Sequence, residues 1–204
     1  LFDREGFGRF VCPLCGKGYW ALAERANCGD SAHERYSFFR DKPRDVTYVE
    51  FWKKFADYWK SKGHAVIPRY PVISRWRDDL YFTIASIVDF QRLENNKIVF
   101  EYPNNPLIVP QLCLRFPDIA NIGVTGRHLS GFMMAGQHAF GAPKTGYWKE
   151  ECLEYNYEYL TRVLGVDKKE LVYGEDLWNM PDYSAFGPCI EAFSKGSELV
   201  NSVF

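Results

Sequence analysis

The sequence has no run of 18 or more apolar residues, and a helix that crosses a membrane needs a run of about that length. Its first residues, LFDREGFGRF, also lack the basic stretch and the apolar core of a secretory signal peptide. These two absences predict a cytoplasmic protein without membrane contact. The chain begins with leucine and not methionine, so we expect it to be a shortened or processed chain.

Several well-known enzyme signatures are also missing. The sequence contains no GxxxxGK[ST] loop, no GxGxxG, no HExxH and no GxSxG. Their absence argues against a P-loop nucleotidase, a Rossmann dehydrogenase and an α/β-hydrolase. If the protein uses ATP, side chains on a sheet must hold it, because no glycine-rich loop opens a helix.

An excess of charge of either sign is absent as well. The 25 basic and 26 acidic residues give a formal net charge of −1, so any contact with nucleic acid must be local. The chain is 47% hydrophobic and 17% aromatic, which predicts a packed core and not a disordered chain. Its 204 residues are enough for one substantial domain with a small appendage.

Three of the six cysteines lie within the first 28 residues. Cys12 and Cys15 form a CxxC pair, and Cys28 and His33 follow at a spacing that can close a tetrahedral zinc shell. In a chain without a secretory signal, such cysteines favour a metal over disulfides. The alternative is an ordinary CxxC turn beside a surface histidine. We predict a small zinc-binding extension over residues 1–42.

A long helix is expected after this extension. Thr47 and Glu50 fit a capping box at its start, and the aromatic residues that follow recur at helical spacing. Gly63 stands where the end of a helix favours a left-handed residue. A second amphipathic helix is expected over residues 148–163. The stretches expected to form strands are 64–68, 80–85, 97–102, 111–116, 171–173, 187–191 and 197–204, with a short helical piece at 87–93.

The stretch 110–140 combines residues that suit a nucleotide. Its first strand ends on Arg115, a glycine-bearing loop follows, and a second strand begins near His128 and carries Phe132. Arginine presents a planar fork to phosphate oxygens, and an aromatic face can stack on a base. The alternative is a plain hairpin, in which Phe132 and Met134 are core residues. Strands in runs with the helices set apart predict an α+β fold around an antiparallel sheet.

The order of a long helix, a short strand and an Arg–loop–His–x–x–x–Phe hairpin resembles motifs 1 and 2 of the class II aminoacyl-tRNA synthetases. The stretch CLRFPDIANIGVTGRHLSGFMMAGQHAF resembles in particular the motif 2 hairpin of archaeal alanyl-tRNA synthetases. The stretches KSKGHAVIP, LWNMPDYSAFGPCIEAF and SELVNSVF agree, as does the CxxC-bearing N-terminus. The resemblance implies that residues 43–204 form the front part of a class II aminoacylation domain, an antiparallel sheet flanked by helices.

The resemblance also implies a role for individual residues. Arg115 would clamp the α-phosphate of ATP and the carboxylate of alanine, and His128 would reach the outer phosphates as the second catalytic residue. Phe132 would stack on adenine. The remaining ATP-binding residues would be Asp118 and Arg127, and the alanine pocket would be lined by Met134, Trp178, Asn201 and Val203. Taken alone, Trp178 is more often a packing residue, and Asn201 near a strand end is ordinarily a satisfied turn or edge group. Glu191 is equally a functional group or a charge on a strand face.

The function implied by the resemblance is ATP-dependent activation of L-alanine and transfer to tRNA(Ala), with Mg²⁺ bridging the phosphates. Two features depart from the family pattern: Met133 stands where bacterial relatives carry glutamate, and the family's third motif would lie beyond Phe204. We therefore expect the chain to need the remainder of the catalytic domain, and to be inactive alone. The alternatives are a non-catalytic zinc-bearing RNA-binding or scaffold module, and a paralogue that activates another small carboxylate.

Overall fold

The computed structural model describes residues 1–34, 46–95, 97–117, 119–126, 128–142, 144–179 and 186–204. Contacts divide these residues into two compact units. One joins the N-terminal residues to Trp148–Phe204, and the other spans Val46–Tyr147. The expected boundary between residues 42 and 43 lies outside the described residues. Within the described ranges, no helix has both the length and the apolar composition that a membrane span requires.

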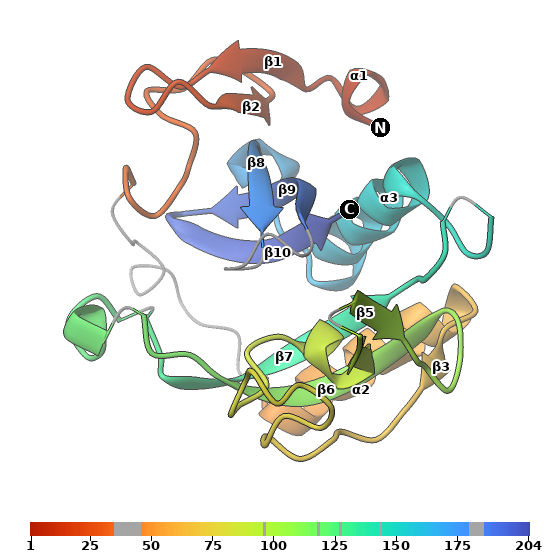
Figure 1. Ribbon diagram of the computed structural model, residues 1–204. Coiled ribbons are helices and arrows are strands. Elements are labelled where there is room, and N and C mark those ends of the chain that lie inside the picture. Colours follow the sequence, from red (N-terminus) through yellow and green to blue (C-terminus); the bar gives the residue numbers. More distant parts are fainter. Residues whose placement is uncertain (35–45, 96, 118, 127, 143, 180–185) are drawn as a thin grey trace. The chain divides into compact units, whose positions relative to one another are not determined.

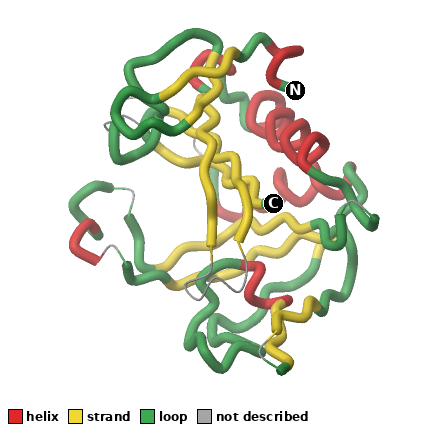
Figure 2. The backbone as a smooth tube through the Cα atoms, turned by 45° about the horizontal axis from the view of Figure 1, so that its top comes forward, coloured by secondary structure: helices red, strands yellow, loops and turns green. Residues whose placement is uncertain are grey.

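The first unit is built on a five-stranded antiparallel sheet in the order β1-β2-β8-β9-β10. The strands pair neighbour to neighbour, and α3 contacts β10 (Figures 1 and 2). Its strands are β1 (Gly8–Val11), β2 (Gly18–Ala21), β8 (Val172–Asn179), β9 (Phe186–Ser194) and β10 (Ser197–Val203). Its helices are α1 (Phe2–Glu5), α3 (Lys149–Glu158), the π-helical turn η4 (Tyr159–Val163) and the 3₁₀ turn η5 (Lys168–Glu170).

Alternation of side chains along the strands separates two packed faces of this sheet. Tyr173 and Ala192 pack with Leu160 of the turn after α3 and with Phe7 on one face. Tyr19, Ala21 and Val172 pack with two of the knuckle cysteines on the other face; these cysteines are Cys12 and Cys28. The N-terminal extension is therefore held by the same sheet as the C-terminal strands, which the sequence order alone does not indicate.

The second unit contains a three-stranded sheet in the order β3-β6-β7 and the separate hairpin β4–β5 (Figure 1). Strand β3 runs parallel to β6, whereas β6 and β7 are antiparallel along their whole length. Phe90, Leu107 and Val109 are fully buried at the centre of its core. Its elements are α2 (Tyr48–Ser61), β3 (Ala65–Val66), η2 (Ser86–Phe90), β4 (Gln91–Glu94), β5 (Lys97–Phe100), β6 (Leu107–Leu114), η3 (Ile119–Asn121) and β7 (Gly131–His138).

The predicted α+β class and several local signals are confirmed. Helix α2 begins at the capping box, where the Thr47 hydroxyl accepts from the Glu50 N–H and the Glu50 carboxylate accepts from the Thr47 N–H. Gly63 follows the helix with a φ of 87°, in the left-handed region that glycine reaches most easily. The predicted helix over 148–163 forms as α3 and η4.

Other predicted elements are corrected. Residues 80–85 form no strand: Phe82 makes one isolated bridge to Ile73, and the carbonyl of Thr83 accepts from Leu114. Strand β6 begins at Leu107, four residues earlier than expected, and runs through Pro110. Proline is tolerated there because the N–H groups of alternate residues point to the β3 side, and β3 has already ended at that level.

Strand β8 continues to Asn179, six residues beyond the end of the predicted strand 171–173. It pairs with β9 as far as Asn179, and cations of the N-terminal segment bind two of its acidic residues. Arg9 binds Glu175 with contacts of 2.7 and 2.6 Å, and Lys17 binds Asp176 at 2.5 Å. The start of β7 at Gly131, three residues after the expected start, leaves His128 in the preceding loop.

Candidate functional site

The hairpin β6–β7 places an arginine over an aromatic ring. Cys113 faces Phe132 in the register, so Arg115, two residues further on, projects from the same face. The Cζ atom of Arg115 lies 5.1 Å from the centroid of the Phe132 ring. This is a cation–π arrangement, and it presents a planar cation and an aromatic face together.

The orientation of Arg115 is fixed by the backbone of a neighbouring segment. Its Nε donates to the carbonyl of Ile84 at 2.7 Å, and the Leu114 N–H donates to the carbonyl of Thr83 at 3.0 Å. Among the residues that the structure describes, no acceptor contacts the two terminal nitrogens of this exposed guanidinium. The fork is therefore anchored at its base, and its two terminal nitrogens can bind a carboxylate or a phosphate.

Met134 lies two residues after Phe132 on the same face of β7. Its sulfur contacts the N–H of Ser86 at 3.4 Å and the hydroxyl of Ser86 at 3.3 Å. The same hydroxyl lies 2.8 Å from Nε2 of His138, a half-buried residue whose pKa is lowered to about 4 by desolvation of the ring. Turn η2 thus packs against the β7 face that carries the predicted adenine-stacking ring.

His128 is partly buried in the loop before β7. Its Nδ1 lies 2.6 Å from the hydroxyl of Thr125, which also accepts from the His128 N–H at 3.3 Å. This contact fixes the ring plane and leaves Nε2 for another partner. The two other predicted ATP-binding residues of this loop, Asp118 and Arg127, lie outside the described residues.

The predicted pocket residues of the first unit lie on β8 and β10. Trp178, half-buried near the end of β8, donates from Nε1 to the carbonyl of Phe204 at 3.1 Å. Its register partner is Gly187, where any added Cβ would collide with the Phe204 carbonyl and crowd the Trp178 indole. Gly187 therefore allows the indole to lie close against the sheet.

Asn201 and Val203 are exposed on one face of β10, two residues apart as predicted. Asn201 lies opposite Glu191 in the register, and its Nδ2 donates to Glu191 Oε1 at 3.1 Å. Ser202, between them, points to the other face and accepts from Asn156 of α3 at 3.0 Å. The two predicted alanine contacts thus share a face with Glu191, and the helix covers the opposite face.

Glu191 is an unusual carboxylate. Its pKa is raised to about 7, first by burial and then by the acidic groups Glu198, Asp176 and Asp30, while Lys17 acts in the opposite direction. Desolvation and like charge both disfavour the ionised form. A half-buried acid with such a pKa, beside two predicted substrate contacts, belongs among the candidate functional residues.

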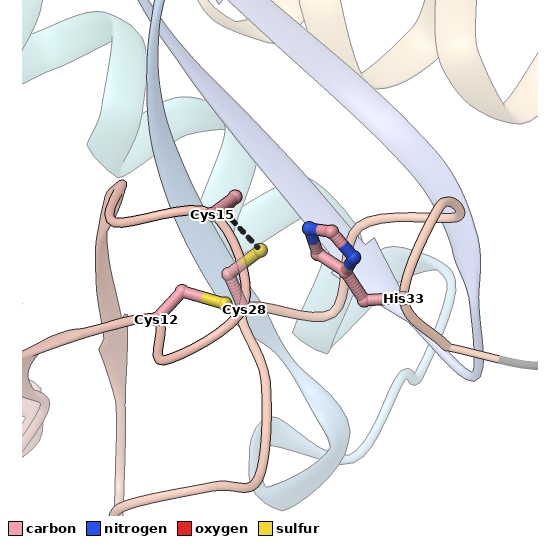
Figure 3. Close-up of side chains that lie close together, drawn as sticks. All are labelled: Cys12, Cys15, Cys28 and His33. Carbon is pink, nitrogen blue, oxygen red and sulfur yellow. Dashed lines mark hydrogen bonds between the residues drawn. The ribbon is translucent and has the colours of Figure 1, made fainter.

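The four predicted zinc ligands converge. The ligand atoms of Cys12, Cys15, Cys28 and His33 all lie within 4.8 Å of one another (Figure 3). The sulfurs of Cys15 and Cys28 are 3.9 Å apart. Two thiolates bound to one tetrahedral zinc lie about 3.8 Å apart, given zinc–sulfur bonds of about 2.3 Å. The donor set and its spacing fit a structural zinc site.

The knuckle stabilises negative charge on one of its sulfurs, that of Cys12, whereas burial raises the pKa of the Cys28 thiol. Burial raises the pKa of the Cys12 thiol, but the backbone N–H groups of Leu14, Cys15 and Cys28 outweigh this effect and lower the pKa to about 7. Amide donors directed at a sulfur favour the thiolate, the form that binds metal. Gly16 has a φ of 73° and completes the tight turn after Cys12, in which the amides of Leu14 and Cys15 lie.

Known proteins are similar to this chain over the region that contains these site residues. Residues 50–198 match the family model of the tRNA synthetases class II (A), which is most of the chain. The chain belongs to the class II tRNA synthetases. It is 50% identical over 206 residues to the alanine–tRNA ligase of Cenarchaeum symbiosum, and 48% identical over 207 residues to that of Nitrosopumilus maritimus. Each alignment covers 100% of this chain and 23% of the relative.

A third relative, the alanine–tRNA ligase of Methanothermobacter thermautotrophicus, is 38% identical over 206 residues, covering 99% of this chain and 22% of the relative. The resemblance to archaeal alanyl-tRNA synthetases is therefore confirmed over the whole chain. The chain spans about a quarter of the length of the curated relatives it matches.

Some groups that contact the predicted site residues of this synthetase-family chain could not be identified from its sequence. The carbonyl of Ile84 holds Arg115, and Ser86 contacts Met134. Ile84 lies in the stretch 80–85 that was expected to form a strand, and Ser86 lies between it and the expected helical piece 87–93. No side-chain pattern indicates a backbone anchor there. Glu191 was left undecided, and its place opposite Asn201 depends on the register of β9 and β10.

Proposed function

We propose that this chain is the front part of the catalytic domain of an alanine–tRNA ligase, which activates L-alanine with ATP and transfers it to tRNA(Ala). The observation that carries the proposal is the anchored guanidinium of Arg115 over the Phe132 ring. Membership of the class II family and identity to alanine–tRNA ligases along the whole chain support it.

In this proposal, the hairpin β6–β7 binds ATP. Arg115 grips the α-phosphate and the alanine carboxylate with its two terminal nitrogens, and Phe132 stacks on adenine. His128, oriented by Thr125, reaches the outer phosphates, and Asp118 and Arg127 of the same loop complete the ATP contacts. Mg²⁺ bound with ATP would neutralise charge on the phosphates, and it would need few protein ligands to do so.

Trp178, Asn201, Val203 and Met134 would bind the amino acid. Trp178 is held flat by its hydrogen bond to Phe204 and forms an apolar wall, and Val203 contacts the methyl group. Asn201 accepts from the ammonium. One methyl group is worth only about 1–3 kcal/mol, so such a pocket rejects glycine weakly, and it excludes serine poorly by size alone. We therefore expect correction of errors elsewhere in the complete enzyme.

The reaction needs little covalent work from the protein. The alanine carboxylate attacks the α-phosphorus in line, a bond to phosphorus forms, and pyrophosphate leaves to give alanyl-adenylate. Catalysis comes from positioning and from stabilisation of charge on the phosphoryl oxygens. Arginine suits this task because its guanidinium stays charged and binds two oxygens at once.

We also propose that Cys12, Cys15, Cys28 and His33 bind a structural zinc ion. The ligand spacing and the thiolate-favouring amides at Cys12 support this assignment. The site lies beside Tyr19 and Val172 of the sheet, so bound zinc would hold the N-terminal extension against β8. Its role would be structural, because four protein ligands leave no open position.

The test is ATP–pyrophosphate exchange with a panel of amino acids, in a protein that continues this chain to the length of its relatives. Exchange that depends on alanine and runs more weakly with glycine and serine supports the proposal. Exchange with another small carboxylate only would identify a paralogue of different specificity. No exchange with any amino acid, in a folded protein that binds RNA, would identify a non-catalytic module.

A further inference from the structure

Glu191 and Asn201 face each other across the last two strands. They are register partners on β9 and β10, and Asn201 Nδ2 lies 3.1 Å from Glu191 Oε1. The pairing is set by the backbone ladder, which continues through Ser202–Ile190 and Val203–Cys189. The contact therefore does not depend on long, flexible side chains that happen to meet.

An ionised carboxylate can only accept hydrogen bonds, whereas an asparagine amide has one donating end and one accepting end. With Glu191 ionised, the amide of Asn201 must turn its NH₂ toward the carboxylate, and Oδ1 then points away. Among the residues that the structure describes, no group donates to this Oδ1, and Asn201 is exposed. A carboxylate partner thus decides an orientation that an isolated amide leaves open.

We propose that Glu191 is a positioning residue, which holds the amide of Asn201 so that its Oδ1 accepts a hydrogen bond from the ammonium of the bound amino acid. This inference rests on the proposed function, because it assigns the ammonium contact to Asn201. It adds a residue that does not touch the substrate and acts through its neighbour.

The surroundings of Glu191 make this orientation dependent on pH. Glu198 of the same strand pair, Asp176 of β8 and Asp30 of the knuckle face it, and Lys17 is engaged by Asp176. Burial and these acids raise the pKa of Glu191 to about 7. Below that pH the Glu191 carboxyl carries a proton and can donate to Oδ1 of Asn201. The amide can then also lie the other way round, with Oδ1 and not NH₂ toward Glu191.

The first test uses the 204-residue chain and nuclear magnetic resonance of the Asn201 side-chain NH₂. We expect its proton shifts to titrate with a midpoint near pH 7 in the wild-type chain, and this titration to be lost in Glu191→Gln. Absence of any Glu191-dependent shift would overturn the inference. This readout involves no substrate, so it stands apart from the proposed function.

The second test measures exchange kinetics in the continued protein. Glu191→Leu should raise the KM for the amino acid about tenfold, the size expected for one hydrogen bond to a charged group, with the KM for ATP unchanged. Glu191→Gln should recover only part of this loss and resemble wild type at low pH, because its Oε1 still accepts from Asn201 while its NH₂ can also donate to Oδ1 of the reversed amide. In wild type the KM should rise as the pH falls from 8 to 6, and in Glu191→Gln it should not.

Two outcomes of this second test would contradict the proposed role of Glu191. Equal losses in Glu191→Leu and Glu191→Gln would assign the effect to the charge of Glu191, and an unchanged KM in both would remove it from substrate binding. The comparison of wild type with Glu191→Gln does not need the leucine variant to fold. If the enzyme activates an amino acid other than alanine, the alanine assignment fails, but the same dependence must hold, since every amino acid presents an ammonium.

Discussion

Arg115 and Phe132 are 17 positions apart, and the antiparallel register of β6 and β7 brings the guanidinium to 5.1 Å from the ring centroid. The same arginine is held at Nε by the carbonyl of Ile84 at 2.7 Å. These contacts use the base and one face of the guanidinium. The terminal nitrogens keep the fork geometry that distinguishes arginine from lysine.

Replacing this fork should reduce activity while keeping the charge. We expect Arg115→Lys in the continued protein to lower alanine-dependent ATP–pyrophosphate exchange by about 10²–10³-fold, the usual loss when one preorganised donor to developing charge is removed. The matched control is Arg162→Ala, because Arg162 is a solvent-exposed arginine paired with Glu158 on the helix surface. Near-normal exchange in Arg115→Lys would remove Arg115 from its proposed role.

The Cys/His cluster should bind zinc and stabilise the fold through it. We expect metal analysis of the purified chain to find zinc, and Cys15→Ser to lose it because one tetrahedral ligand is gone. A chelator should lower the melting temperature of the wild-type chain, since metal bound only to the folded state stabilises it. The chelator should have no such effect on Cys15→Ser.

The control for the zinc prediction is Cys152→Ser, which changes a buried cysteine of α3 that is not part of the cluster. This variant should keep its zinc. A wild-type chain that contains no metal, with all four cluster groups open to modification, would refute the assignment.

His64 should make the chain sensitive to acid. The ring is buried, with Nε2 2.8 Å from the Tyr147 hydroxyl and Nδ1 3.2 Å from the carbonyl of Trp59, and burial lowers its pKa from 6.5 to about 4. A depressed histidine pKa stabilises the fold while the ring is neutral. That contribution is present above pH 6.5 and is lost as the pH falls toward 4.

We therefore expect the free energy of unfolding, measured with urea, to fall between pH 7 and pH 5. His64 should contribute up to about 2 kcal/mol of this fall, and His64→Gln should show a correspondingly smaller change. His138, whose pKa is also lowered to about 4, should contribute in the same direction, so His138→Gln serves as an independent comparison. An identical pH dependence in wild type and both variants would contradict the prediction.

The contribution of the α2 capping box to stability should be measurable separately from the candidate functional site. Thr47→Ala removes the hydroxyl that accepts from the Glu50 N–H at 3.3 Å, and should cost about 1 kcal/mol of unfolding free energy. Lys53→Ala, at an exposed position of the same helix, should change stability little. Equal losses in the two variants would show that the cap contributes nothing beyond helix propensity.

The parts of the fold that follow from neighbouring residues could be predicted from the sequence. The cap at Thr47, the left-handed Gly63 and the Cys12–Cys15 turn depend on groups a few positions apart, so their spacing already fixes their geometry. The hairpin around Arg115 was predictable for the same reason. The ends of its two strands were predicted wrongly, because the length of a strand depends on the backbone hydrogen-bonding partners in the neighbouring strands.

Long-range pairing decided the rest. Strand β8 extends through Glu175 and Asp176 because β9 pairs with it as far as Asn179, and Arg9 and Lys17, more than 150 positions earlier, bind the two carboxylates. The stretch 80–85 has strand-like composition, but its hydrogen-bonding partners are single residues and not a ladder. Propensity alone cannot separate these cases, because both depend on contacts with distant segments.

From the residues alone, the spacing of cysteines and histidine predicted a zinc-like ligand set, and the resemblance of whole stretches predicted the family and, through it, the substrate contacts. The tertiary structure alone decided that the knuckle packs on the sheet of the C-terminal strands, that a backbone carbonyl orients Arg115, and that Glu191 stands opposite Asn201. Orientation and pKa arise from burial and from partners brought together by strand register, and neither is written in local sequence.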